Sequence, residues 1–257
     1  MGQISAVTRK MLQEFIRDRM ALLWTFAVPV FFLLIIPFIN AGNIPAEVMP
    51  GFKAYATISM TTLLMMTACQ ANLAGSVASD TQRGLYLKMT SMPVKAWKEG
   101  IGRILGILIF SLLGAILLAS LGLSYGAEFI LNPVTLIESL VFLMFISLAS
   151  TGIGLIIASF VKGESAATHT GVALTLLTFF CGGMVAPYAA LPSALQVFAR
   201  FHPVSSANAA IAFLLVGEGF AGYNPLRISQ IGLTTAISIA VFAVGLMLYS
   251  KRCWRKR

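Results

Sequence analysis

Few residues inside the apolar parts of this sequence could carry chemistry. Glu138 and His169 are the ionisable candidates, and Gln70 and Asn72 are polar candidates within another apolar run. An ionisable group at membrane depth usually serves the transport of ions or polar substrates. Near a helix end the same side chain reaches water and headgroups, so interfacial solvation is the default interpretation of Glu138 and His169. For Gln70 and Asn72 the default is hydrogen bonding between helices, and lining a substrate path is the alternative.

Patterns typical of catalysis and metal binding do not occur in the sequence. It has no Ser/His/Asp or paired-carboxylate arrangement, no HExxH and no GxxxxGK[ST] phosphate loop. We therefore expect neither an intramembrane hydrolase nor a nucleotide site, and the chain is predicted not to be an enzyme. Cys69, Cys181 and Cys253 form no CxxC pattern, which predicts neither a disulfide framework nor a zinc site.

The elements that position the polar candidates must be membrane helices. Of the 257 residues, 58% are hydrophobic and 11% are charged, and the mean hydropathy is +0.88. Such a chain has too little polar surface to cover a water-soluble globule. The net charge of +9 does not indicate nucleic-acid binding, because the basic residues form no stripe with interleaved aromatics. We expect an all-α integral membrane protein with a single domain over residues 1–257.

Six apolar runs predict six transmembrane helices, because each is close to the ~20 residues that cross a bilayer. They cover residues 21–39, 55–77, 104–125, 135–161, 166–186 and 228–249. Fifteen of the eighteen Lys and Arg residues lie before the first run, between the second and third, between the fourth and fifth, or after the sixth. The positive-inside rule makes these segments cytoplasmic. The prediction is a multi-pass protein of the cell membrane with both termini inside.

Residues 1–20 predict an amphipathic helix in front of the first run. Val7, Met11 and Phe15 recur at helical spacing, and Arg9 and Arg17 lie on the remaining face. We expect this helix to lie on the inner leaflet. Two interpretations stay open: the helix anchors the chain against anionic headgroups, or it docks a partner.

The cytoplasmic segment 78–103 between the second and third runs carries both charges and apolar residues. Lys95, Glu99 and Arg103 have the i,i+4 spacing that favours helix. A flexible tether would be rich in Gly and Ser, whereas this segment also contains Tyr86 and Trp97, which can pack against another surface. The composition predicts contact with a cytoplasmic partner.

Residues 187–227 predict an irregular outer segment between the fifth and sixth runs. Gly182-Gly183 and Pro187 break the fifth run, and Pro192 suits the first turn of a short helix. The apolar stretch that follows, 204–216, is too short to span a bilayer as a helix. We predict a re-entrant or interfacial helical hairpin. Irregular backbone at membrane depth needs protein or water around it, so this hairpin either lines a pathway or forms a structural lid.

Three stretches of the sequence resemble the ABC-2 type membrane permeases, six-span subunits that work with a separate ATP-binding cassette protein. They are residues 16–24 leading into Val28-Pro29, residues 79–84 through Ser91-Met92-Pro93, and residues 182–187 through Leu191-Pro192 to His202-Pro203. The resemblance covers nearly the whole chain, and the third stretch is the most specific. In that family the coupling loop commonly begins with an acidic run before Arg-Gly, whereas here only Asp80 supplies that charge.

The resemblance implies a role for each of these segments. Residues 1–20 resemble an interface helix, 78–103 a coupling loop, and 187–227 a segment that closes the outer mouth. The residues implied in coupling to an ATPase are Arg9, Arg17, Asp18, Arg19, Asp80, Arg83, Gly84, Ser91 and Pro93. The residues implied in an outer gate are Gly182, Gly183, Pro187, Leu191, Pro192 and Pro203.

The function implied by the resemblance is that of the permease subunit of an ATP-driven exporter. The implied partners are an ATP-binding cassette ATPase, which would hold ATP and Mg²⁺, a second copy of the chain or a related permease, and the lipid bilayer. Closure of two ATPases would rock the spans between inward-open and outward-open arrangements. Two alternatives stay open: an ion- or proton-coupled secondary transporter, which predicts midplane charges and inverted repeats, and a membrane scaffold that transports nothing.

Overall fold

The computed structural model describes residues 2–92, 95–186 and 188–254, and every regular element in these residues is helical. The elements are α1 (Gln3–Arg17), α2 (Arg19–Ile39), α3 (Met49–Met66), the π-helix η1 (Thr67–Asn72), α4 (Leu73–Gln82), α5 (Leu85–Thr90), α6 (Ala96–Ser124), α7 (Pro133–Phe160), α8 (Glu164–Cys181), the 3-10 turn η2 (Tyr188–Ala190), α9 (Ser193–Phe201), α10 (Pro203–Leu215), α11 (Glu218–Ala221) and α12 (Ile228–Arg252). The all-α prediction is confirmed for the described residues.

Four helices in the described residues are long and apolar enough to cross a membrane, namely α2, α6, α7 and α12. The segments predicted as the second and fifth spans form the run α3–η1–α4 and the helix α8. Both are more polar than the other four. The run α3–η1–α4 is also largely enclosed in the bundle, with every side chain of α3 from Ala54 onward buried. Its hydroxyl and amide groups therefore meet other helices and not lipid.

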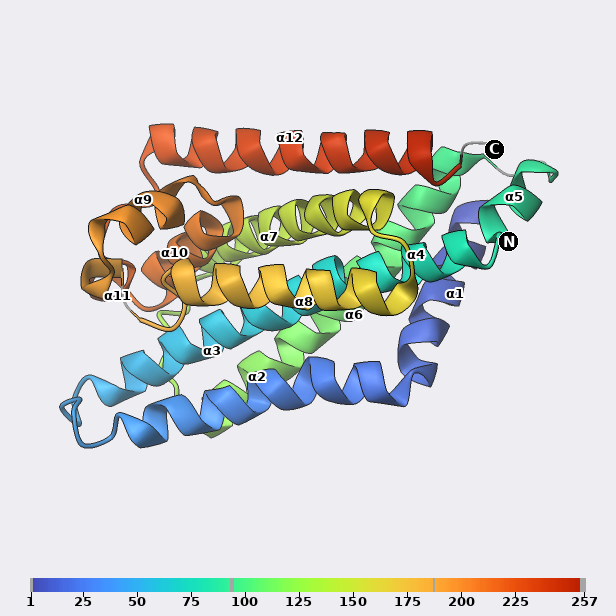
Figure 1. The fold of residues 1–257 in the computed structure, drawn as a ribbon. Helices are drawn as coiled ribbons and strands as arrows, with labels where there is room; N and C mark the ends of the chain where they lie inside the picture. Colours follow the sequence, from blue (N-terminus) through green and yellow to red (C-terminus); the bar gives the residue numbers. More distant parts are fainter. Residues whose placement is uncertain (1, 93–94, 187, 255–257) are drawn as a thin grey trace.

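The run α3–η1–α4 passes through the middle of the bundle (Figure 1), where α3 contacts α2, α6, α7 and α10. Glycines on the neighbouring helices allow a close approach to η1. A Cβ on Gly154 of α7 would lie 2.7 Å from the carbonyl oxygen of Cys69, and one on Gly171 of α8 would lie 2.5 Å from the Cα of Ala71. The π-helix is therefore enclosed by α7 and α8.

Helix α1, which the sequence analysis predicted as an amphipathic helix, packs closely on α6. Gly102 and Gly106 of α6 form a GxxxG pattern, and a Cβ on either would lie 2.7 Å from the Cβ of Val7 or Met11 of α1. Phe15 stacks on Phe110 with ring centroids 4.8 Å apart. The apolar face that the sequence analysis placed on the inner leaflet is thus covered by α6, because the two glycines let the helices meet.

The two ends of the bundle have different elements. At one end, called the inner end here, lie α1, α5, the start of α6 and the end of α12 (Figure 1). Segment 78–103 is mostly helical there, because α4 continues to Gln82 and α6 begins at Ala96. At the other end, called the outer end, η2, α9, α10 and α11 occupy segment 187–227. Pro203 is in the first turn of α10, and Pro192 is the N-cap of α9.

Candidate functional site

A buried group of charged side chains joins α4 and α6 at the inner end. The guanidinium of Arg103 donates from Nε and Nη2 to Glu99 Oε1, at 3.0 and 2.7 Å, one helical turn away on α6. Its Nη2 also lies 2.5 Å from Asp80 Oδ2, and its Nη1 donates to Ser76 Oγ at 2.9 Å. The side chains of Arg103 and Glu99 are 2% exposed, and that of Asp80 is 13% exposed. This arginine is thus enclosed by acceptors from two helices.

The same group reaches two further helices. The hydroxyl of Tyr249 on α12 donates to Glu99 Oε2. On α1, Lys10 Nζ lies 3.3 Å from Asp80 Oδ2 and 3.2 Å from Glu14 Oε1. We call these residues the inner polar network: Lys10, Glu14, Ser76, Asp80, Glu99, Arg103 and Tyr249. It connects the interface helix to α4, α6 and α12.

The physical consequence of the inner polar network is a strong preference for one arrangement of the four helices. Two charges removed from water cost several kcal/mol each unless they are paired and hydrogen-bonded. Arg103 satisfies this condition only while Asp80 and Glu99 keep their places on α4 and α6. A displacement of α4 alone would break the buried pair of Asp80 with Arg103, whereas α1 is held by the half-exposed Lys10, so α4 and α6 in particular are expected to move together.

An exposed rim surrounds the network. Arg83, 75% exposed at the end of α4, lies 3.6 Å from Glu164 Oε2 at the start of α8, and Ser79 Oγ donates to the same oxygen at 2.6 Å. Gly84 follows with φ +68°, which only glycine adopts without strain, and starts α5. On α5, burial raises the pKa of the Tyr86 phenol well above its usual range.

The predicted coupling residues of the first stretch lie at the corner between α1 and α2. Asp18 alone separates the two helices, and its carboxylate accepts from the backbone N–H of Ala21 at 3.0 Å, which caps α2. Arg17 and Arg19 are exposed on this corner, Arg9 is exposed midway along α1, and Ser91 is exposed after α5. The predicted coupling residue Pro93 lies outside the described residues.

An open cleft of about 960 Å³ lies between the α1–α2 corner, α4 and the start of α8. We call it the inner cleft. It brings together residues that the sequence analysis assigned to separate segments, namely Arg17, Asp18, Asn72, Asp80, Arg83 and His169. Met11, Phe15 and Met20 supply apolar lining. The cleft therefore offers a mixed polar and apolar surface that a solute could enter.

The predicted intramembrane polar residues fall into different environments. Gln70 is fully buried in η1 and donates to the carbonyl of Gly171 at 3.2 Å. Asn72 donates to Thr25 Oγ1 of α2 at 2.9 Å while lining the inner cleft. A π-helix is rare and is frequently found at functional sites, and the sequence analysis did not predict it. Glu138 is exposed near the start of α7, away from Gln70 and Asn72.

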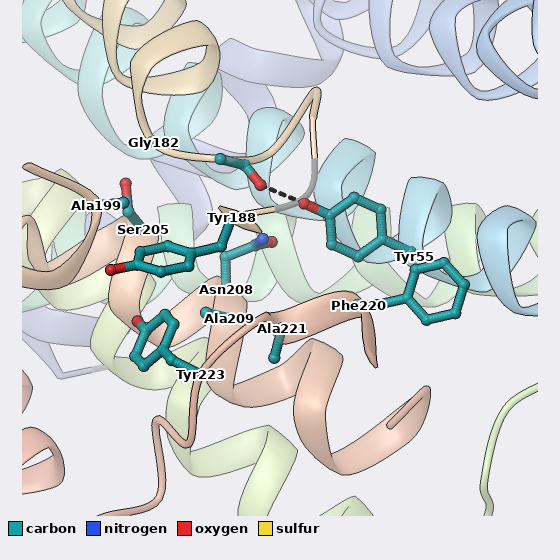
Figure 2. A pocket seen from close by; sticks show the side chains of 11 residues that line it. Tyr55, Gly182, Tyr188, Ala199, Ser205, Asn208, Ala209, Phe220, Ala221 and Tyr223 are labelled. Carbon is teal, nitrogen blue, oxygen red and sulfur yellow. Dashed lines mark hydrogen bonds between the residues drawn. The ribbon is translucent and has the colours of Figure 1, made fainter. Parts of the chain in front are cut away.

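The predicted outer-gate residues meet the central helix at the outer end. The hydroxyl of Tyr55 on α3 donates to the carbonyl of Gly183, as the dashed line in Figure 2 shows. Gly183 has φ +76°, and a Cβ on Gly182 would collide with Ser205 of α10, so both glycines are required by the local backbone. Beside them is a cavity of about 10 Å³, enough for about one water molecule.

An aromatic clamp closes over this region. The guanidinium of Arg200 on α9 lies 5.2 Å from the ring centroid of Tyr188 and 5.1 Å from that of Tyr223. The Tyr188 and Tyr223 rings are themselves 4.6 Å apart, and Figure 2 shows them beside the small cavity. Leu191 is partly buried near Gly183, and the predicted gate residue Pro187 lies outside the described residues. The clamp ties α9 to the segments on both sides of the hairpin.

A comparison with known protein families identifies the family of this chain. The sequence pattern of the family described as ABC-2 type transporter matches residues 2–216. The match covers α1 through α10, and thus the inner polar network except Tyr249, the inner cleft and most of the outer segment. The chain belongs to the ABC-2 type transporter family. A search of curated proteins finds no match for it.

For this ABC-2 chain, the sequence analysis missed several residues that hold the site together. Glu99 and Arg103 were noted only for their helical spacing. Their burial follows from the packing of α1 on α6 and from side chains of α4 and α12 that contact them. Tyr249 carried no signal, because a tyrosine near the end of an apolar run is ordinary at a membrane interface. The one available clue was that opposite charges one helical turn apart precede a long apolar run.

Proposed function

We propose that this chain is the permease subunit of an ATP-driven exporter and works with a separate ATP-binding cassette ATPase. Membership of the ABC-2 family supports a membrane subunit of a transporter. The observation that carries the proposal further is the inner polar network, which ties α1 and α4 to α6 and α12 through the buried Arg103. A force on exposed inner segments would reach two helices of membrane length.

The proposed topology has six spans with both termini in the cytoplasm. They are α2, the run α3–η1–α4, α6, α7, α8 and α12. The run α3–η1–α4 is largely enclosed by other helices, which fits its polarity and a position inside a bundle. Helix α8 contacts α4 and η1 on one side and exposes Leu177 and Phe180 on the other. The distribution of Lys and Arg assigns the inner end to the cytoplasm.

The proposed ATPase contact is the exposed rim around the inner polar network. Arg9, Arg17, Arg19 and Arg83 offer cations there, and α5 offers Leu87, which is 53% exposed. Asp80, in contrast, pairs with Arg103 and Lys10 and would act inside the chain. Movement of the ATPases would push the α1–α2 corner and α5 as one body. Two copies of the chain, or one copy and a related permease, would form the pathway.

The proposed transport cycle uses the inner cleft and the outer hairpin in turn. A solute would enter the inner cleft beside Asn72 and His169. The outer hairpin would keep the far side shut through the contact of Tyr55 with Gly183 and the aromatic clamp on Arg200. Rigid-body rocking of the helices would then exchange the open side.

Charge reversal at Arg83 tests the proposal. In vesicles containing the chain and its ATPase, we expect Arg83→Glu to abolish the stimulation of ATP hydrolysis by the chain and to abolish transport. Folding should be preserved, because an exposed ion pair such as Arg83–Glu164 contributes at most about 1 kcal/mol. Arg227→Glu, an exposed reversal at the outer end, is the matched control and should leave both activities unchanged.

Three outcomes would contradict the proposal. Normal transport by Arg83→Glu would remove Arg83 from the coupling contact. If no ATPase co-purifies with the chain and vesicles show transport driven by a proton or ion gradient alone, the chain is a secondary transporter. A chain that binds an ATPase yet moves no solute under either energy source would be a scaffold.

A further inference from the structure

A second open hollow lies at the inner end, on a different face of α4 from the inner cleft. Its volume is about 950 Å³, and it is formed by the end of α4, α5, the end of α7 and the end of α12. We call it the basic groove. The residues that characterise it are Gln82, Leu87, Phe160, Lys162, Lys251 and Arg252.

All the charged side chains that line the basic groove are cations. Lys162, Lys251 and Arg252 line it, and its lining contains no carboxylate. In the described part of the chain, none of these three cations lies within ion-pair distance of an acidic side chain. Three cations whose charge no neighbour neutralises create a positive potential in a concave site, and this favours an anionic ligand.

The inner cleft shows that this single sign is not general at the inner end. The cleft has nearly the same volume and also opens beside α4, yet its lining includes Glu14, Asp18, Asp80 and Glu164. The two hollows thus have nearly equal volumes, but only the inner cleft is lined by carboxylates. The anion preference belongs to the basic groove specifically.

The position of the basic groove fits the level of lipid headgroups. The helices α7 and α12 are both long and apolar enough to cross a membrane, and they end at Phe160 and Arg252. The end of a spanning helix marks the boundary between hydrocarbon and headgroups. Lys162, Lys251 and Arg252 are exposed at this boundary.

Apolar side chains flank the cations on the same rim. Phe160 is 56% exposed and Leu87 is 53% exposed. The guanidinium of Arg252 lies 4.1 Å from the ring centroid of Phe160, which holds the charge at the junction of polar and apolar surface. A ligand with an anionic head and hydrocarbon tails would meet both kinds of surface at once.

We propose that the basic groove binds the headgroup of an anionic phospholipid from the inner leaflet. Its phosphate would contact Lys162, Lys251 and Arg252, and its acyl chains would lie against Phe160 and the neighbouring bilayer. Basic hollows between helices on the cytoplasmic side are suited to such headgroups. The groove shares Leu87 of α5 with the proposed ATPase contact, but lipid binding to it requires no ATPase.

Native mass spectrometry of the detergent-purified full chain tests the proposal. The protein is incubated with an equimolar mixture of phosphatidylglycerol and phosphatidylcholine that carry the same acyl chains. We expect selective retention of phosphatidylglycerol. The triple variant Lys162→Gln, Lys251→Gln, Arg252→Gln should weaken this retention about a hundredfold, since each cation near a lipid surface contributes ~1 kcal/mol.

The matched control removes the same charge elsewhere at the inner end, through Lys88→Gln, Lys95→Gln and Lys98→Gln. It should retain phosphatidylglycerol as the unaltered chain does. All six side chains are exposed or half-buried, so both variants should keep the fold, which thermal unfolding in the same detergent verifies.

Three results would overturn the proposal. Equal loss of lipid in both triple variants would mean that net charge alone attracts the lipid. Equal retention of the two lipids by the unaltered chain would mean that no anion site exists. If the groove variant keeps its lipid but no longer co-purifies with the ATPase, the groove binds an acidic segment of that protein instead.

Discussion

At the inner end of the bundle, two cations and three carboxylates share one hydrogen-bonded group, and its central Arg103 is 2% exposed. At the outer end, neutral hydrogen bonds and the contacts of Arg200 with two tyrosine rings take this place. Thr62 Oγ1 donates to Asn208 Oδ1 at 2.8 Å, and Ser206 and Thr234 are joined at 2.7 Å. Among the described residues, no ion pair lies at the outer end. The two ends connect helices with different chemistry.

This difference bears on how each end can move. A buried ion pair is expensive to break, because each separated charge would be left without a partner in a poorly solvated site. Neutral hydrogen bonds cost less to exchange, since water or another hydroxyl can replace the partner. The comparison indicates an inner end that moves as one rigid body and an outer end that can open by small local steps.

The largest expected effect comes from removing the charge at the centre of the inner polar network. Arg103→Met should lower the free energy of unfolding by about 3–5 kcal/mol, because Asp80 and Glu99 lose their buried partner. Denaturant unfolding in detergent measures this. Arg83→Met, which removes an exposed cation from the same end, should cost at most about 1 kcal/mol. Equal losses in the two variants would show that burial does not distinguish the network.

A smaller effect is expected from the neutral contact at the outer end. Asn208→Leu should lower the free energy of unfolding by about 1–3 kcal/mol, because it leaves the buried Thr62 hydroxyl without its partner. Adding Thr62→Val should restore part of that loss, which a double-mutant cycle measures. Ser120→Ala, at an exposed hydroxyl, is the control. If Asn208→Leu lowers the free energy of unfolding as much as Arg103→Met does, the buried contacts at the two ends do not differ in strength.

The smallest effect on the free energy of unfolding at neutral pH concerns a titratable group at the outer end. Burial lowers the pKa of His202 to about 4, whereas an unfolded histidine titrates near 6.5. Between these values the unfolded chain binds a proton that the folded chain does not, so the free energy of unfolding should fall as the pH falls from about 6.5 to about 4. We expect His202→Gln to remove this dependence, which is negligible at neutral pH and reaches about 3 kcal/mol near pH 4.

The other histidine provides the comparison for that pH series. His169 is exposed in the inner cleft, and His169→Gln should leave the dependence in place. Thermal unfolding of both variants across this pH range in one detergent is the measurement. A pH dependence that survives in His202→Gln would assign the effect to another group.

Much of the fold was predictable because apolar runs of membrane length can only be helices in lipid. The runs at residues 21–39, 135–161 and 228–249 correspond to α2, α7 and α12. The π-helix η1 was not predictable, since its six residues have no distinctive composition. Its place depends on the close approach of Gly154 and Gly171 from two other helices.

The candidate site was predictable in its segments and not in its contacts. The sequence indicated that 1–20, 78–103 and 187–227 carry the informative residues, and the resemblance to ABC-2 permeases grouped Arg83 with Asp80 as coupling residues. The structure separates their environments, because Asp80 faces Arg103 inside the bundle while Arg83 remains 75% exposed. Arg83 is the C-cap that follows the last turn of α4, so its side chain can leave the face on which Asp80 lies.

The sequence by itself determined that this is an all-helical membrane chain with a basic side, and that it resembles the ABC-2 permeases. Hydrophobic length and charge distribution suffice for that, because they depend on each segment alone. Only the tertiary structure decided which charged side chains are buried together and which of the two hollows at the inner end is lined by cations without carboxylates. Those properties arise where helices distant in sequence meet, so no single segment contains them.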